Sequence, residues 1–134
     1  MIGHLNYTHI AVSTVAYFAI GSIWYSVLFS KKWMSLGRIT MGEADKKNIF
    51  IMFGITLILN FIITVSTACV VHLISPPTLV NAIKVGLMLG GGIVFATCAM
   101  SYMYAKRPFL LTWIDAGYHF AGITVVSVIL MLWK

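Results

Sequence analysis

Residues 49–74 read IFIMFGITLILNFIITVSTACVVHLI, and they decide the fold. The stretch contains no Asp, Glu, Lys or Arg. It exceeds the length of about 20 apolar residues that a helix needs to cross the roughly 30 Å hydrocarbon core of a bilayer. Two consecutive prolines follow in Ser75-Pro76-Pro77-Thr78 and cannot continue a helix. The stretch therefore predicts a membrane-spanning helix that ends at a sharp turn.

Three more stretches are also long and predominantly apolar, at residues 8–30, 80–105 and 110–133. Hydrophobic residues make up 60% of the chain and charged residues only 9%, against roughly 25% charged residues in a soluble domain. Lipid must therefore surround most of the molecule. We expect an all-α fold, an integral membrane four-helix bundle, with residues 1–134 forming a single transmembrane domain.

The connector at residues 31–48 holds most of the polar residues of the first half of the chain. Within it, Thr40-Met41-Gly42-Glu43 has the spacing of a capping box at a helix start. We expect a short surface helix from about Met41 that runs into the second span. The alternative is an ordinary polar loop.

The net charge of +6 is concentrated beside the spans. Seven of the nine Lys and Arg residues lie in two connectors that share one side of the predicted bundle, and the positive-inside rule places this side in the cytoplasm. The N-terminus and C-terminus then lie outside, and we expect a multi-pass membrane protein, which the family resemblance described below would place in the bacterial inner membrane. No nucleic-acid motif accompanies these cations. The seven basic residues of the two connectors are Lys31, Lys32, Arg38, Lys46, Lys47, Lys106 and Arg107.

The two cysteines, Cys69 and Cys98, are predicted at depths that differ by roughly 20 Å. A disulfide needs Cα atoms about 4.4–6.8 Å apart. We expect both residues to be packed as free thiols.

Asp115 and His119 are the sharpest functional signal. They lie four residues apart on one face of the predicted fourth helix, about 8 Å and 13 Å from its cytoplasmic end. Ionisable residues at such depth usually face the bundle interior or a wet cavity. Similar depth counts bring Trp24, Tyr25 and Asn60 near them, and Tyr118 precedes His119. These six residues form a candidate pocket, open to the cytoplasm, for a solute or for proton relay.

The alternative for this pair is structural. Asp115 would pair with Lys106 or Arg107, and His119 would be a hydrogen-bonded neutral imidazole. Small residues in the spans are expected to let helices approach closely, because helix association in lipid depends on close packing. The glycines predicted at such contacts are Gly21, Gly86, Gly90 and Gly122.

The outer side carries His4, His9 and His72. Histidines could bind a metal or a haem iron, but the spacing matches no ligand motif. His9 and His72 are therefore weak metal candidates, and we expect no metal and no cofactor. No nucleophile motif, phosphate loop or dinucleotide fingerprint occurs, and Asp115 is the only acidic residue within a predicted span. The sequence favours a role other than catalysis.

Two separated motifs resemble a known family. Gly21-Ser-Ile-Trp24-Tyr25-Ser26, with Phe29, Lys32 and Trp33, is similar to the first span of domain-of-unknown-function family 1761, whose members are small four-span bacterial membrane proteins. Trp113-Ile-Asp115-Ala-Gly117-Tyr118-His119 resembles the last span of that family. The family more often carries an amide where Asp115 stands, which weakens any mechanism that needs a carboxylate there. The resemblance implies the fold and topology and leaves the activity open.

Three functions remain. The first is an oligomeric transporter or channel-like protein, in which several copies enclose the polar pocket for a small solute. The second is a structural or accessory subunit that binds lipid or a partner protein. The third is a membrane-embedded redox or haem-binding subunit.

Overall fold

The computed structural model describes residues 3, 5–37 and 43–133, and the side-chain surroundings within these ranges except at residues 37 and 43–47. The described residues are helical and contain no strand. Four helical segments among them are long and apolar enough to cross a membrane, at Tyr7–Leu28, Asn48–His72, Leu79–Tyr104 and Phe109–Leu132. The prediction of an all-α protein with four apolar spans is confirmed.

The first span consists of α1 (Tyr7–Ile23) and a π-helical turn, η2 (Trp24–Leu28). Asn6 caps α1, because its side-chain oxygen accepts hydrogen bonds from the backbone N–H groups of Thr8 (3.0 Å) and His9 (3.3 Å). A short helix, α2 (Ser30–Gly37), follows directly. The sequence interpretation missed α2, because its apolar residues are too few to mark a span.

The second span belongs to α3 (Glu43–His72), one helix of 30 residues. It runs without a break from the connector into the apolar stretch. Thr40, Met41 and Gly42 of the expected capping box lie outside the described residues.

The third span is built from α4 (Leu79–Gly86), a long π-helical segment η3 (Leu87–Val94) and α5 (Phe95–Tyr104). The side chain of Thr78 caps α4 by accepting a hydrogen bond from the N–H of Asn81 (3.3 Å). Lys106 ends the span with a left-handed backbone (φ 55°). Two hydrogen bonds of the Schellman type accompany this turn, from the N–H of Lys106 to Met103 and from the N–H of Arg107 to Tyr102.

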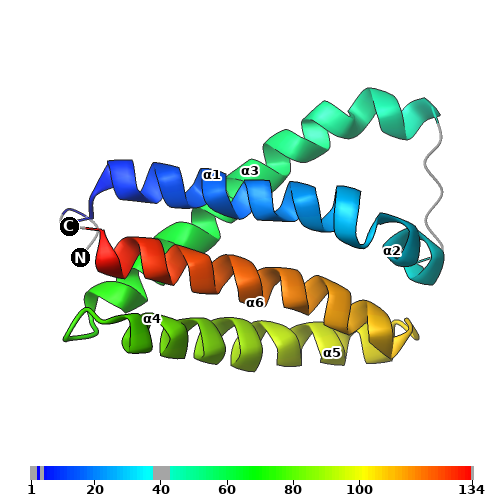
Figure 1. The fold of residues 1–134 in the computed structure, drawn as a ribbon. Helices are drawn as coiled ribbons and strands as arrows, with labels where there is room; N and C mark the ends of the chain where they lie inside the picture. Colours follow the sequence, from blue (N-terminus) through cyan, green and yellow to red (C-terminus); the bar gives the residue numbers. More distant parts are fainter. Residues whose placement is uncertain (1–2, 4, 38–42, 134) are drawn as a thin grey trace.

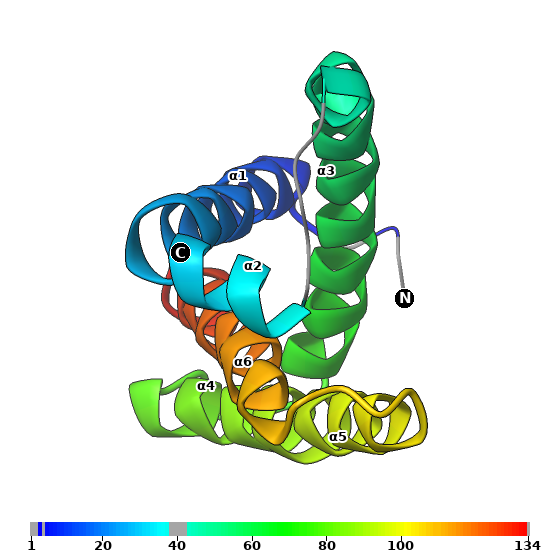
Figure 2. The same ribbon diagram turned by 90° about the vertical axis from the view of Figure 1, so that its right-hand side faces the viewer.

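The last helix, α6 (Phe109–Leu132), is the centre of the bundle. It contacts α1, α2, α3, α4, η3 and α5. Figure 2 shows α6 between α1 on one side and α4–α5 on the other, with α3 crossing beside them. Both chain ends and the Ser75–Thr78 turn lie at one end of the bundle, and α2 and the α5–α6 turn lie at the other (Figure 1).

The first half of α3 leans away from the other helices (Figure 1). Every side chain from Phe50 to Leu59 is exposed within the chain, and the first buried one is Asn60. Before Asn60 its ring contact with the bundle is that of Phe53 with Phe18 of α1 (centroids 6.0 Å apart), and the buried side chains among its described residues begin at Asn60.

Glycines allow the helices around α6 to come close. Tyr17 of α1 lies against Gly122 of α6, and Tyr118 of α6 lies against Gly21 of α1. Each helix carries one Tyr-x-x-x-Gly sequence, Tyr17 to Gly21 in α1 and Tyr118 to Gly122 in α6, so the two antiparallel helices meet through reciprocal tyrosine-on-glycine contacts. On the other side of α6, a Cβ atom added at Gly86 would overlap Thr124, and one added at Gly90 would lie 2.7 Å from the Cα of Phe120.

Gly122→Ala tests the α1–α6 contact. Its added Cβ overlaps the ring of Tyr17, so we expect the free energy of unfolding to fall by about 1–3 kcal/mol, as for overpacked cores. Gly54→Ala is the matched control, because nothing in the described residues lies within 4 Å of the added carbon. Thermal unfolding in detergent measures both variants, and equal midpoints would contradict the role given to Gly122.

Candidate functional site

The Asp115 carboxylate lies inside the bundle and is held by two tyrosines. Asp115 is only 8% exposed. Its Oδ1 accepts a hydrogen bond from the Tyr25 hydroxyl in η2 (2.6 Å), and its Oδ2 accepts one from the Tyr102 hydroxyl in α5 (2.5 Å). The carboxylate thus joins the first, third and fourth spans.

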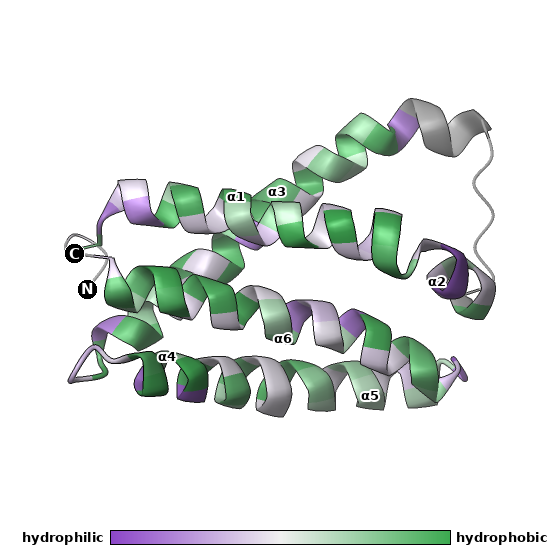
Figure 3. Cartoon of the chain, viewed as in Figure 1, coloured by the Kyte–Doolittle hydropathy of each residue, from purple (hydrophilic) through white to green (hydrophobic). Residues whose placement is uncertain are grey.

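His119 is bonded to a third tyrosine. Its Nδ1 lies 2.5 Å from the hydroxyl of Tyr17 in α1, and which atom donates depends on the imidazole tautomer. Tyr17 is fully buried. The two residues that the sequence singled out on α6 are therefore held by separate tyrosines of the first span, Tyr25 and Tyr17. Figure 3 shows hydrophilic bands along α6 in an otherwise hydrophobic bundle.

Tyr118 connects this group to α3. Its hydroxyl donates a hydrogen bond to Oδ1 of Asn60 (3.3 Å). Its ring packs against Tyr17, Tyr25 and His119, with centroid distances of 5.2, 5.4 and 4.6 Å. We call the seven residues of this network the Asp115 centre: Asp115, His119, Tyr118, Tyr17, Tyr25, Tyr102 and Asn60.

The structure brings together five of the six residues that the sequence grouped around Asp115. The sixth, Trp24, lies beside the centre and donates its indole N–H to the backbone oxygen of Ile114 (2.9 Å). An added Cβ at Gly117 would lie 3.2 Å from its ring, so Trp24 packs directly on the α6 backbone. The role given to these residues stays a prediction.

Sequence reasoning left Tyr17 and Tyr102 out of the site. Tyr17 lies on the same helical face as Gly21 and Tyr25, at intervals of four residues, and this spacing was the available signal. Tyr102 carried no such signal. It lies close to the end of its span, and its long side chain reaches the carboxylate from there.

Among the described residues, eight serine and threonine hydroxyl groups in the spans donate to a carbonyl of their own helix. Thr14, Thr67 and Ser127, for example, donate to the carbonyl four residues earlier, at 2.8 Å. Four other buried polar atoms have no hydrogen-bond partner in the described residues. An unpaired buried polar group costs about 1–3 kcal/mol, so these atoms require an explanation. They are Ser13 Oγ, Asn60 Nδ2, Thr64 Oγ1 and Thr112 Oγ1.

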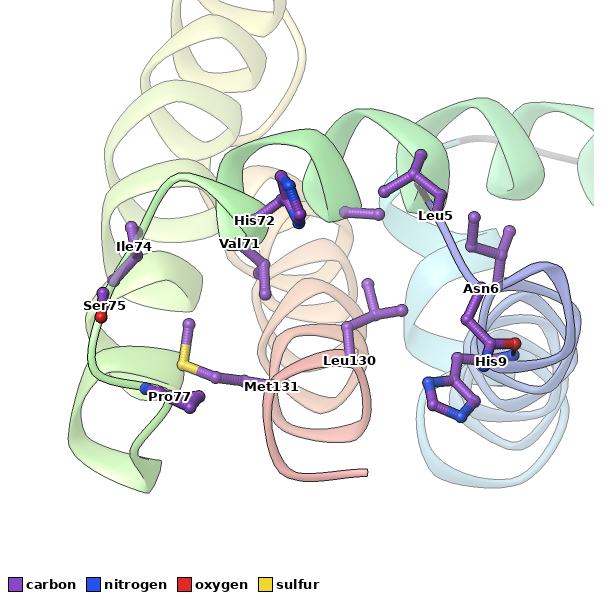
Figure 4. A pocket seen from close by; sticks show the side chains of 12 residues that line it. Leu5, Asn6, His9, Val71, His72, Ile74, Ser75, Pro77, Leu130 and Met131 are labelled. Carbon is purple, nitrogen blue, oxygen red and sulfur yellow. Dashed lines mark hydrogen bonds between the residues drawn. The ribbon is translucent and has the colours of Figure 1, made fainter. Parts of the chain in front are cut away.

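A hollow of about 390 Å³ lies between α1, α3 and α6, at the end of the bundle that carries the chain termini. We call it the terminal hollow. His9 and His72 line it from α1 and α3 (Figure 4). Its lining comprises Leu5, Asn6, His9, Ile10, Ala68, Val71, His72, Ile74, Ser75, Pro77, Leu130 and Met131.

The two described histidines at this end have different surroundings. The His9 ring stacks on Trp133, with centroids 4.3 Å apart and planes 17° apart. His72 is exposed. His4 lies outside the described residues, and within the part of the chain that is described, no three His, Cys, Asp or Glu side chains form a group that could hold a metal ion.

A second hollow, of about 310 Å³, lies between the third span and α6. Glycines and aromatic rings line it, and neither hollow includes Asp115 or His119. Its residues are Gly90, Gly91, Phe95, Trp113, Ala116, Gly117 and Phe120. Cys69 and Cys98 are both free thiols.

Comparison with known proteins identifies the family. No curated protein matches the chain, and no solved structure matches it. The model of one family, described as "Protein of unknown function (DUF1761)", matches residues 8–131, which include all of the Asp115 centre. This match covers most of the 134 residues. The chain therefore belongs to the DUF1761 family of proteins of unknown function.

Proposed function

We propose that the protein is a small membrane transporter in which the Asp115 centre binds a polar solute or passes a proton. The observation that carries this proposal is the buried carboxylate of Asp115, hydrogen-bonded by Tyr25 and Tyr102 from two other spans. A carboxylate within a span is costly and usually marks a solute or proton pathway. His119, one turn away, adds a second group that can exchange a proton.

The unpaired Nδ2 of Asn60 supports a hydrogen-bonding ligand at this centre. Asn60 is 2% exposed, and its Oδ1 accepts the hydrogen bond from the Tyr118 hydroxyl. Its Nδ2 has no hydrogen-bond partner in the described residues. Asn60 is also the first described residue of α3 that is buried, after the exposed residues from Phe50 to Leu59. A solute could therefore approach the centre beside the first half of α3. Four spans enclose little volume, so we propose that the transporting unit is a homo-oligomer.

We propose that the chain forms a single transmembrane domain in a bacterial inner membrane, and its basic residues indicate the orientation. The end with α2 and the α5–α6 turn carries Lys31, Lys32, Lys106 and Arg107. The positive-inside rule places that end in the cytoplasm. Both termini would then lie outside, and solute would reach Asn60 from the cytoplasm.

A second candidate function is a structural or accessory subunit. It is favoured by the fact that both oxygens of Asp115 already have tyrosine partners within the chain. In this case the centre only fastens three spans together, and the exposed apolar helices contact lipid or a partner protein. The redox alternative would use His9 and His72, or Tyr118 with His119, and the His9 ring is stacked on Trp133.

Native mass spectrometry of the protein, extracted gently from its membrane, tests the transporter proposal. We expect an oligomer that carries a reproducible small-molecule adduct, and we expect Asp115→Asn and His119→Gln to lose the adduct but keep the oligomer. Thr97→Val is the control, since Thr97 is exposed and bonds only to its own helix. A wild-type protein with no adduct except bulk lipid would contradict the proposal.

Removal of single hydroxyl groups tests the structural candidate. Tyr25→Phe and Tyr102→Phe each leave one oxygen of Asp115 without its donor. Hydrogen bonds to charged groups contribute about 1.5–3 kcal/mol, and we expect the free energy of unfolding to fall by that amount. Tyr104→Phe, at a residue that is 78% exposed, should change it by less than about 0.5 kcal/mol. Unfolding in detergent measures all three, and unchanged stability in both centre variants would remove the structural candidate.

Reporter fusions test the orientation. Alkaline phosphatase fused after the last residue should be active, because the C-terminus is proposed to lie outside the cytoplasm. The same enzyme fused after Arg107 should be inactive. The reverse pattern of activities would show that the basic connectors lie outside.

A further inference from the structure

The terminal hollow and the Asp115 centre both include residues of α1 and α3, Ile10 and Ala68 in the hollow and Tyr17 and Asn60 in the centre. Ile10 of α1 and Ala68 of α3 both line the hollow. One turn deeper on the same helix faces lie Ser13, three residues after Ile10, and Thr64, four residues before Ala68. Both are completely buried.

One further turn reaches the centre itself. Tyr17 follows Ser13 by four residues, and Asn60 precedes Thr64 by four. Tyr17 is bonded to His119, and Asn60 is bonded to Tyr118. The helices α1 and α3 are antiparallel and in contact. Ser13 of α1 therefore lies at about the same depth as Thr64 of α3, and Tyr17 at about the same depth as Asn60. We call this line of residues, Ser13, Thr64, Tyr17 and Asn60, the α1–α3 seam.

Three of the four unpaired buried atoms belong to this seam, namely Ser13 Oγ, Thr64 Oγ1 and Asn60 Nδ2. The hydroxyls of neighbouring Thr14 and Thr67 donate to backbone carbonyls of their own helices. The helical backbone at this depth can therefore accept a hydroxyl hydrogen bond, but Ser13 and Thr64 make none. A buried water is stable where it finds two to four polar partners. The hydroxyls of Ser13 and Thr64 and the amide of Asn60 offer such partners at successive levels.

We propose that water enters the α1–α3 seam from the terminal hollow and extends to Asn60, so that protons can reach the Asp115 centre from the end that carries the termini. Ile10 and Ala68 form the narrow part between hollow and seam. The inference rests on the proposed function in one respect, since it supplies the second access that a transporter requires. Its test detects water in the seam and does not depend on any solute.

Accessibility of single cysteines to silver ion tests the route. Silver ion is small and hydrophilic, and it binds thiols. In a background with Cys69→Ala and Cys98→Ala, reconstituted in lipid nanodiscs, Thr64→Cys and Ser13→Cys should be protected by silver from later alkylation. Ile62→Cys is the matched control, because Ile62 lies two residues from Thr64 at nearly the same depth and is exposed on the surface of the helix.

We expect protection at position 64 or 13 to be at least about tenfold faster than at position 62. Two positions are tested so that a local folding defect in one variant does not decide the outcome. Fast protection at either position supports the proposal. If both react as slowly as Ile62→Cys, the seam is dry and the proposal is overturned.

Ala68→Leu in the Thr64→Cys protein tests the entrance. The larger side chain fills the narrow part of the route, so protection at position 64 should slow several-fold while that at position 62 stays the same. Unchanged protection would show that water does not enter through the hollow. A dry seam in a protein whose wild-type form carries the adduct would refute this route alone. A wet seam in a protein whose wild-type form carries no adduct would refute the transporter function alone.

Discussion

The arrangement of the bundle depends on the close approach of α1 and α6. Tyr17 lies on Gly122 and Tyr118 lies on Gly21, so each helix supplies one large ring and one bare backbone surface. In lipid no hydrophobic effect drives apolar helices together, and close van der Waals contact has to do so. This contact also fixes the register between the two helices. It places Tyr17 at His119 and Tyr25 at Asp115, and the polar network follows from it.

Tyrosine side chains are suited to bind a carboxylate among apolar helices. A phenol has an apolar ring that packs in the core and a hydroxyl that donates to the charge. Tyr25 and Tyr102 bond to the two oxygens of Asp115, and their rings remain among the helices. The same property lets Tyr118 contact three aromatic rings and also bond to Asn60. The centre is therefore both a packing core and a polar site.

The sequence predicted the features that the bilayer alone imposes. Backbone groups in lipid must be satisfied within a helix, so apolar stretches such as residues 49–74 are sufficient to predict the spans. Asp115 and His119 stood out because ionisable residues are rare at such depth. Their partners were harder to predict, because the pairing of Tyr102 with Asp115 depends on the register between helices, which no single span reveals. The helix α2 and the π-helical turns of η3 were also not predicted. The eight residues of α2 lack the apolar run that marks a span.

The first half of α3 has a mechanical consequence. From Phe50 to Leu59 no side chain of α3 is buried, although the ring of Phe53 meets that of Phe18 in α1 with centroids 6.0 Å apart. A change in the tilt of this segment therefore disturbs little packing among the described residues. These ten residues extend about 15 Å, and their apolar length must match the local hydrocarbon thickness. In a thinner bilayer the segment would tilt further and turn about Asn60, the residue that bonds to Tyr118. Bilayer thickness would thereby act directly on the polar interior of the protein.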